Sequence, residues 1–196
     1  MINCMVIEEL KKRSKLVPFL IDMYKKGDSN FSRHVIEWLE KNEEIMSKLH
    51  LSEGGEMSVL RSRILKFTDV YRPADERLTQ SALRKGKNAE TASVVERAEE
   101  IIRIAIQESE ERLLQFENKL CEGMTAFLLE NELPPQGRNY MGWLNQIWQM
   151  IKAQGSTRAL AMYISASLVA YDRTYILDKV ISRLSEDELQ AHQRLN

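Results

Sequence analysis

The sequence has few of the residues that build cross-linked or sheet-based proteins. Its 196 residues include two cysteines, Cys4 and Cys121, and thiols this far apart in sequence do not make a disulfide scaffold or a clustered zinc site. Eight glycines and four prolines are few for this length, whereas helix-favouring Glu, Lys, Leu, Arg and Ala are abundant. We therefore expect an all-α protein without a substantial sheet.

Long hydrophobic runs are also missing. The uncharged run at residues 159–171 has 13 residues, fewer than the roughly 20 that a membrane-spanning helix needs. The first apolar stretch has no basic residue before it and ends at Glu8 and Glu9, which is not the pattern of a signal peptide. These features predict a cytoplasmic protein with no membrane segment.

Charge is balanced overall but unevenly distributed. The formal net charge is −1, yet residues 61–90 carry 8 basic and 4 acidic groups, and residues 91–132 carry 4 and 10. A short basic segment is thus followed by a strongly acidic one. Such a dipolar pattern fits either internal pairing or contact with a charged partner.

Helical periodicity and turn residues divide the chain into six to eight predicted helices. Pro18 should kink or split the first of them. Ser93 and Glu96 have capping-box spacing, which predicts that a long helix begins there and runs over 93–130, with Gly123 as its one expected kink. The predicted helices cover residues 6–26, 31–49, 57–70, 93–130, 140–154, 157–184 and 186–195.

The long helix has one continuous apolar stripe. Its members average close to 3.6 residues apart, which is typical of a straight helix in a globular core rather than of a heptad coiled coil. The stripe consists of Val95, Ala98, Ile102, Ala105, Ser109, Leu113, Phe116, Leu120, Met124 and Phe127.

We expect one helical domain over residues 1–196. It would have a short-helix front part (1–72), a basic connecting loop (73–90) and a long-helix back part (91–196) that share one core. Residues 159–171 are apolar on all sides, so this helix must be covered all round. Either it is the centre of the bundle, or it belongs to a homo-oligomer or partner interface.

Motifs for chemistry are scarce. His34, His50 and His192 are isolated, and the sequence contains no phosphate-binding loop, no dinucleotide fingerprint, no nucleophile elbow and no paired metal-ligand spacing. The sequence therefore predicts a protein that is not an enzyme and has no cofactor or metal.

A non-enzymatic interaction protein, either an adaptor or a regulatory subunit of a larger complex, is the preferred function. Its candidate partner-binding residues combine a basic segment with a cluster of the residue types that dominate binding hot spots. These residues are Arg84, Lys85, Lys87, Arg138, Tyr140, Trp143 and Trp148.

A DNA-binding regulator is the alternative hypothesis. Residues 43–67 have the outline of a helix-turn-helix, although the turn is long and the basic residues do not share one face. The basic loop at 72–87 would add phosphate contacts. The candidate nucleic-acid contacts are Arg61, Arg63, Lys66, Arg72 and Arg77.

Overall fold

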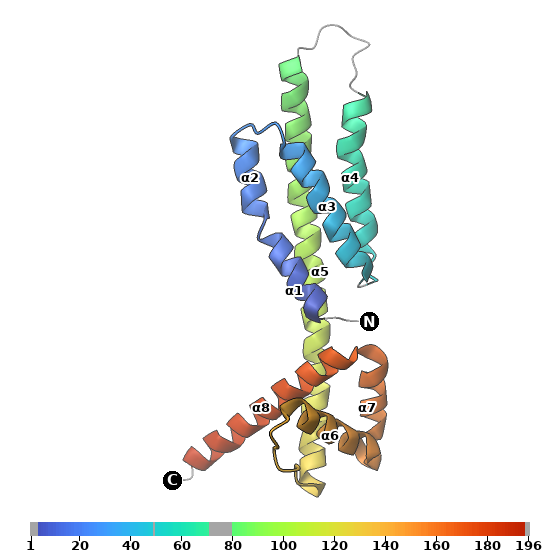
Figure 1. Cartoon of the computed structure of the whole chain (residues 1–196), viewed down its shortest axis with the longest axis vertical. Helices are drawn as coiled ribbons and strands as arrows, with labels where there is room; N and C mark the ends of the chain where they lie inside the picture. The colour runs from blue at the N-terminus through green and yellow to red at the C-terminus, as the bar shows by residue number, and fades with distance from the viewer. Residues whose placement is uncertain (1–3, 49, 71–79, 195–196) are drawn as a thin grey trace. The chain divides into compact units, whose positions relative to one another are not determined.

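The computed structural model describes residues 4–48, 50–70 and 80–194, and these residues are almost entirely helical. The described part of the chain has eight α-helices, which confirms the all-α class (Figure 1). They are α1 (Cys4–Ser14), α2 (Val17–Lys25), α3 (Phe31–Lys48), α4 (Glu53–Val70), α5 (Gln80–Glu130), α6 (Tyr140–Ala153), α7 (Gly155–Ser167) and α8 (Ala170–Arg194). Among these helices, none combines the length and the apolar character needed to span a bilayer.

The chain forms two compact units instead of the single core that the sequence predicted. Cys4–Glu108 make up the N-terminal unit, and the C-terminal unit includes Ser109–Asn196. Each unit has its own cluster of buried apolar side chains. The reason lies in α5, where the apolar stripe passes through Ser109 and the flanking residues are polar or charged over 107–112. A segment with so little apolar surface cannot join two hydrophobic clusters.

In the N-terminal unit, the chain breaks between α1 and α2, as Pro18 predicted. Pro18 lies in the first turn of α2, where its missing N–H is not needed for a helical hydrogen bond. Trp38 of α3 donates its indole N–H to the carbonyl of Arg13 near the end of α1, at 3.0 Å. This bond satisfies a carbonyl that the helix end leaves open.

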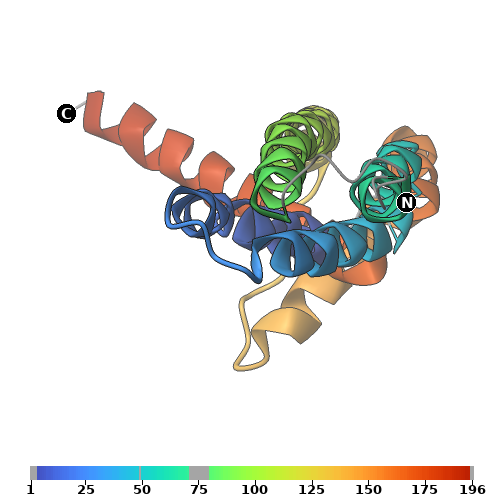
Figure 2. The same cartoon turned by 90° about the horizontal axis from the view of Figure 1, so that it is seen from above.

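Helices α3 and α4 form an antiparallel hairpin, seen side by side in Figures 1 and 2. Gly54 lies against Ser47 near the turn, and Arg61, two turns further along α4, reaches back to Glu40 of α3. The helix predicted over 57–70 begins earlier than expected, because Glu53 already begins α4. The chain reverses at His50, which has the left-handed φ of 55°.

Helix α5 starts earlier than the sequence predicted. It begins at Gln80, so residues 80–90 of the predicted loop are helical, while residues 73–79 lie outside the described residues. The added turns contact the rest of the N-terminal unit, since the Thr91 hydroxyl lies 3.2 Å from that of Ser32 in a buried pair. The capping residues at 93 and 96 therefore fall inside a helix that tertiary contacts extend beyond them. The predicted end near 130 is confirmed, and α5 continues through Gly123.

In the C-terminal unit, α6, α7 and α8 pack with the second part of α5 around one cluster of buried side chains. The sequence predicted one helix over 157–184 and a break at 185. The structure instead breaks the chain at Leu168, whose backbone is extended, and α8 then runs to Arg194. Leu168 is itself buried. No glycine or proline marks this break, and burial of the side chain is its physical cause.

Two helix ends in the N-terminal unit have the same geometry but different residues. At Gly27 (φ 65°), the N–H groups of Gly27 and Asp28 bond back to the carbonyls of Tyr24 and Met23. At His50, the N–H groups of His50 and Leu51 make the equivalent bonds to α3. Both ends are Schellman motifs, in which a left-handed residue is favourable for glycine and strained for other residues.

We predict opposite effects for two exchanges at these ends. His50→Gly should raise the free energy of unfolding by about 0.5–1 kcal/mol, because it relieves left-handed strain, whereas Gly27→Ala should lower it by about 1 kcal/mol. A Cβ at Gly27 would meet no atom within 4 Å, so its cost comes from the backbone alone. Urea denaturation followed by circular dichroism measures both effects. A His50→Gly protein that is less stable than wild type contradicts the assignment of strain to His50.

Candidate functional site

The three predicted aromatic residues of α6 differ in burial: Trp148 is buried, Trp143 is half-buried and Tyr140 is exposed. Trp148, one of the predicted partner-binding residues, is only 2% exposed and belongs to the core of the C-terminal unit. The Arg173 guanidinium lies over its ring at 5.0 Å, and partial burial lowers the pKa of Arg173. Trp148 is therefore a core residue of this unit, and its contact with a partner stays a prediction.

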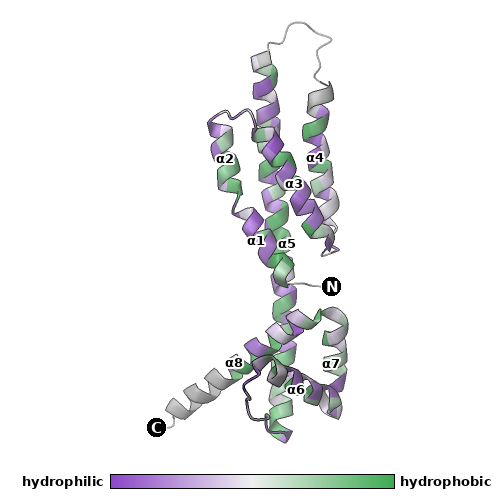
Figure 3. Cartoon of the chain, in the orientation of Figure 1, coloured by the Kyte–Doolittle hydropathy of each residue, from purple (hydrophilic) through white to green (hydrophobic). Residues whose placement is uncertain are grey.

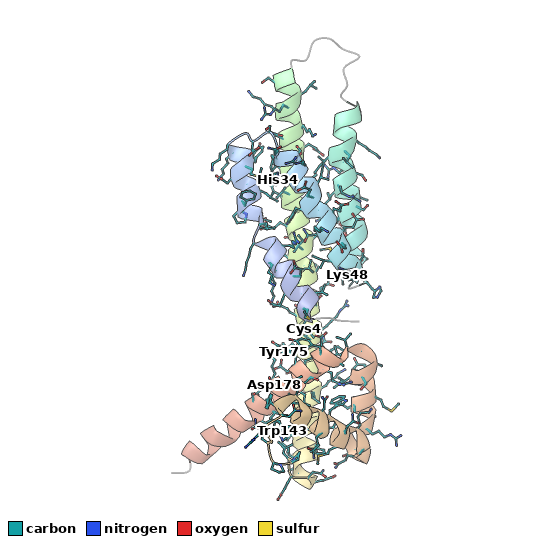
Figure 4. All side chains as sticks on the ribbon, in the orientation of Figure 1. Cys4, His34, Lys48, Trp143, Tyr175 and Asp178 are labelled. Carbon is teal, nitrogen blue, oxygen red and sulfur yellow. The ribbon has the colours of Figure 1, made fainter. Side chains whose placement is uncertain are left out.

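Tyr140 and Trp143 hold α6 in place. Tyr140 donates its hydroxyl to the carboxylate of Asp178 on α8, and Trp143 donates its indole N–H to the carbonyl of Pro134 at 2.7 Å. Figure 4 labels Trp143 and Asp178 in the C-terminal unit. The two rings lie 5.5 Å apart. Hydrogen bonds at both polar atoms assign these aromatic residues a structural role, and Arg138, just before the helix, is exposed.

The predicted basic segment is part of α5. Arg84 donates to the carbonyl of Gly27 at 2.7 Å, so its guanidinium helps to complete the end of α2. Lys85 is exposed and Lys87 is half-buried. The three side chains therefore do not form one mobile basic loop, and Arg84 already has a structural partner.

The predicted nucleic-acid contacts are partly neutralised within the N-terminal unit. Arg61 pairs with Glu43 at 3.0 Å, and Arg63 pairs with Glu90 at 2.6 Å. Lys66 is exposed, while Arg72 and Arg77 lie outside the described residues. A basic side chain that pairs with a carboxylate must give up that partner before it binds a phosphate. The antiparallel packing of α3 and α4 also differs from the crossing of roughly 90–120° in a DNA-binding helix-turn-helix.

Several large apolar side chains of the C-terminal unit are exposed, and two of them, Met162 and Tyr163, are neighbours on α7. Four uncharged side chains of this helix, which we call the α7 face, are exposed: Ala159, Met162, Tyr163 and Ala166. Met162 is 62% exposed and Tyr163 is 47% exposed. The prediction that this helix is the centre of the bundle is wrong, because only one of its sides is buried. Figure 3 shows α7 mostly in white and green, the colours of neutral and hydrophobic residues.

The opposite side of α7 is anchored firmly in the unit. Thr157, Ala161 and Ile164 are buried, and the Thr157 hydroxyl donates to the carbonyl of Ile151 at 2.7 Å. A Cβ at Gly123 of α5 would meet the side chain of Leu160, so the glycine permits α7 to pack close to α5. The α7 face is thus presented on a rigid support.

Tyr163 is also positioned from α5. Its ring lies 5.5 Å from that of Phe116, and the Lys119 ammonium lies over it at 4.6 Å from the ring centre. Contacts of this kind orient an aromatic side chain while leaving part of it exposed. In the sequence, Met162 and Tyr163 do not differ from their buried neighbours. The sequence signal that indicates exposed apolar residues here is that the helix has more apolar residues than are needed to cover one buried side.

The described residues contain no group of three or more His, Cys, Asp or Glu side chains that could hold a metal ion. The comparisons with known proteins found no matching family model, no matching curated protein and no matching solved structure. Among the exposed apolar side chains, those of the α7 face are distinguished by lying together on one side of a helix whose other side is buried.

The Tyr140 hydrogen bond predicts a pH effect. Its bond to Asp178, with burial and the negative charge of that carboxylate, raises the pKa of Tyr140 from 10 to about 12. Because the raised pKa belongs to the folded state, the stabilisation is complete below pH 10 and is lost as the pH rises toward 12.

We expect Tyr140→Phe to lower the free energy of unfolding near neutral pH by about 1 kcal/mol, the low end for a bond to a carboxylate at a partly exposed site. In an absorbance titration, wild type should show a tyrosine that ionises near pH 12, and the variant should lack it. Identical titration curves for the two proteins contradict the bond to Asp178.

Proposed function

We propose that this chain is a non-enzymatic interaction protein, an adaptor or a regulatory subunit of a larger complex, and that the α7 face is its partner-binding surface. The observation that carries the proposal is the exposure of Met162 and Tyr163, together with Ala159 and Ala166, on one side of α7. Methionine and tyrosine are enriched at protein interfaces, and apolar surface gains free energy when a partner covers it.

Rigidity of the support favours binding at this face. The opposite side of α7 is buried, and Lys119 and Phe116 restrain the Tyr163 ring. A preformed surface loses less conformational entropy on binding than a mobile one. The anchored side of α7 therefore supports binding at its exposed side.

The other predicted surfaces have less support as binding sites. Trp148 is buried, and Arg84 donates to Gly27. Arg61 and Arg63 pair with carboxylates, which counts against the DNA-binding alternative. The proposal includes a cytoplasmic location, because a chain of 196 residues with two cysteines does not depend on an oxidising compartment for its fold.

Affinity capture with matched variants tests the proposal. The tagged protein, Met162→Glu and Val59→Glu are each used to capture partners from the native cells, with nuclease treatment, and retained proteins are quantified by mass spectrometry. Val59 is 63% exposed, compared with 62% for Met162, but lies on α4 in the N-terminal unit. The two variants thus add the same charge at similar exposure.

We expect Met162→Glu to reduce retention of a specific partner about tenfold or more, because a charge replaces an apolar anchor, while Val59→Glu retains it. Circular dichroism establishes that both variants are folded. Equal retention by wild type and Met162→Glu would remove the α7 face from consideration, and loss of all partners on nuclease treatment would favour the DNA-binding alternative.

A further inference from the structure

The segment that contains α6 and α7 is free of acidic residues. Residues 133–171 include no Asp or Glu, although they include the cations Arg138, Lys152 and Arg158. In a chain with 29 acidic residues among 196, this is a local bias toward positive charge. The α7 face lies within this segment, so α6 and α7 themselves carry only positive charges, and the carboxylates beside α7, such as that of the exposed Glu122, come from α5.

Two cations flank the apolar side chains of the α7 face. Arg158 precedes Met162 by four residues, so both side chains lie on the same edge of α7. Lys119 of α5 lies over Tyr163 at the other edge. Whereas Lys179 pairs with Glu117 at 3.3 Å, neither Lys119 nor Arg158 pairs with a carboxylate of the described residues. Both edges therefore carry an available positive charge.

We infer that the α7 face binds an acidic amphipathic α-helix of another protein, an inference that rests on the proposed function. Apolar side chains of that helix cover Met162 and Tyr163, and its flanking carboxylates pair with Arg158 and Lys119. Ala159 and Ala166 stand seven residues apart on the exposed side, and such small side chains permit close approach of a second helix. An apolar strip between charged edges is the surface that amphipathic helices recognise.

A second copy of the chain fits this face less well. In a pair of α7 faces, each copy brings Arg158 and Lys119, neither α6 nor α7 supplies a carboxylate to meet them, and the nearby Glu122 of α5 lies three residues from Lys119 of its own copy. A membrane surface also fits less well, because interfacial binding uses a broad strip of residues such as Trp, Phe and Leu, and the α7 face has two large side chains. Charge and size together favour an acidic helix.

Peptide selection on the full chain tests the inference. A displayed library of random peptides of about 18 residues, long enough for five helical turns, is selected on the immobilised wild-type protein with excess soluble Met162→Glu as competitor. Enriched peptides are synthesised with a fluorescent label, and their affinities are measured by anisotropy. The test proteins are wild type, the double variant Lys119→Glu/Arg158→Glu, and Lys25→Glu, an exposed control in the N-terminal unit.

We expect enriched peptides to be acidic, with apolar residues three and four apart. Their binding should weaken roughly tenfold in the double variant and stay unchanged in Lys25→Glu. If charge reversal unfolds the protein, the milder double variant Lys119→Gln/Arg158→Gln tests the contribution of the two charges. Wild-type binding should also weaken as the salt concentration rises from about 0.05 to about 0.5 M.

The contrary outcomes separate the two proposals. Enriched peptides that are uncharged or basic, or that bind the double variant as well as wild type, overturn the acidic-helix inference and leave the α7 face as the binding surface. If no enriched peptide distinguishes wild type from Met162→Glu, the proposed function itself fails at this face. A concentration-dependent dimer in sedimentation that Met162→Glu abolishes identifies a second copy as the occupant and overturns the inference.

Discussion

The apolar stripe of α5 is the surface on which both hydrophobic cores depend. Val95, Ala98 and Ile102 belong to the core of the N-terminal unit, and Phe116 and Leu120 belong to that of the C-terminal unit. Each shorter helix must bury its own apolar side within one of these cores, because isolated short helices are marginal in water. Where the stripe is interrupted by polar residues over 107–112, the single core predicted from the sequence becomes two.

The C-terminal unit illustrates how covering one side of a helix leaves another side open. The core takes up Ala161 and Ile164 of α7, and the close approach at Gly123 brings that side toward α5. Apolar residues also lie on the other side of α7, so burial of one side leaves Met162 and Tyr163 exposed. Tyr163 packs on Phe116, whereas Met162 is exposed without such a contact being needed by the core. The proposed partner would cover the side chain of Met162.

Charged residues show a different division of roles between the two units. In the N-terminal unit, arginines of α4 pair with carboxylates of α3 and α5, as Arg61 does with Glu43 and Arg63 with Glu90. These ion pairs neutralise the arginines of α4 that were predicted to contact nucleic acid. Residues 133–171, which contain α7, include no acidic residue, and the exposed Arg158 has no carboxylate partner among the described residues. The same residue type thus has a structural role in one unit and a proposed binding role in the other.

Features that depend on residues within about four positions of each other could be predicted from the amino-acid sequence. They are the helical class, the stripe of α5, the break near Pro18 and the helix end near residue 26, because periodicity and turn chemistry are local. The earlier start of α5, the break at Leu168, the burial of Trp148 and the exposure of Met162 emerged only in the folded chain. Each of these depends on contacts between residues far apart in the sequence. The sequence of a helix with several apolar sides does not show which of those sides the rest of the protein will bury.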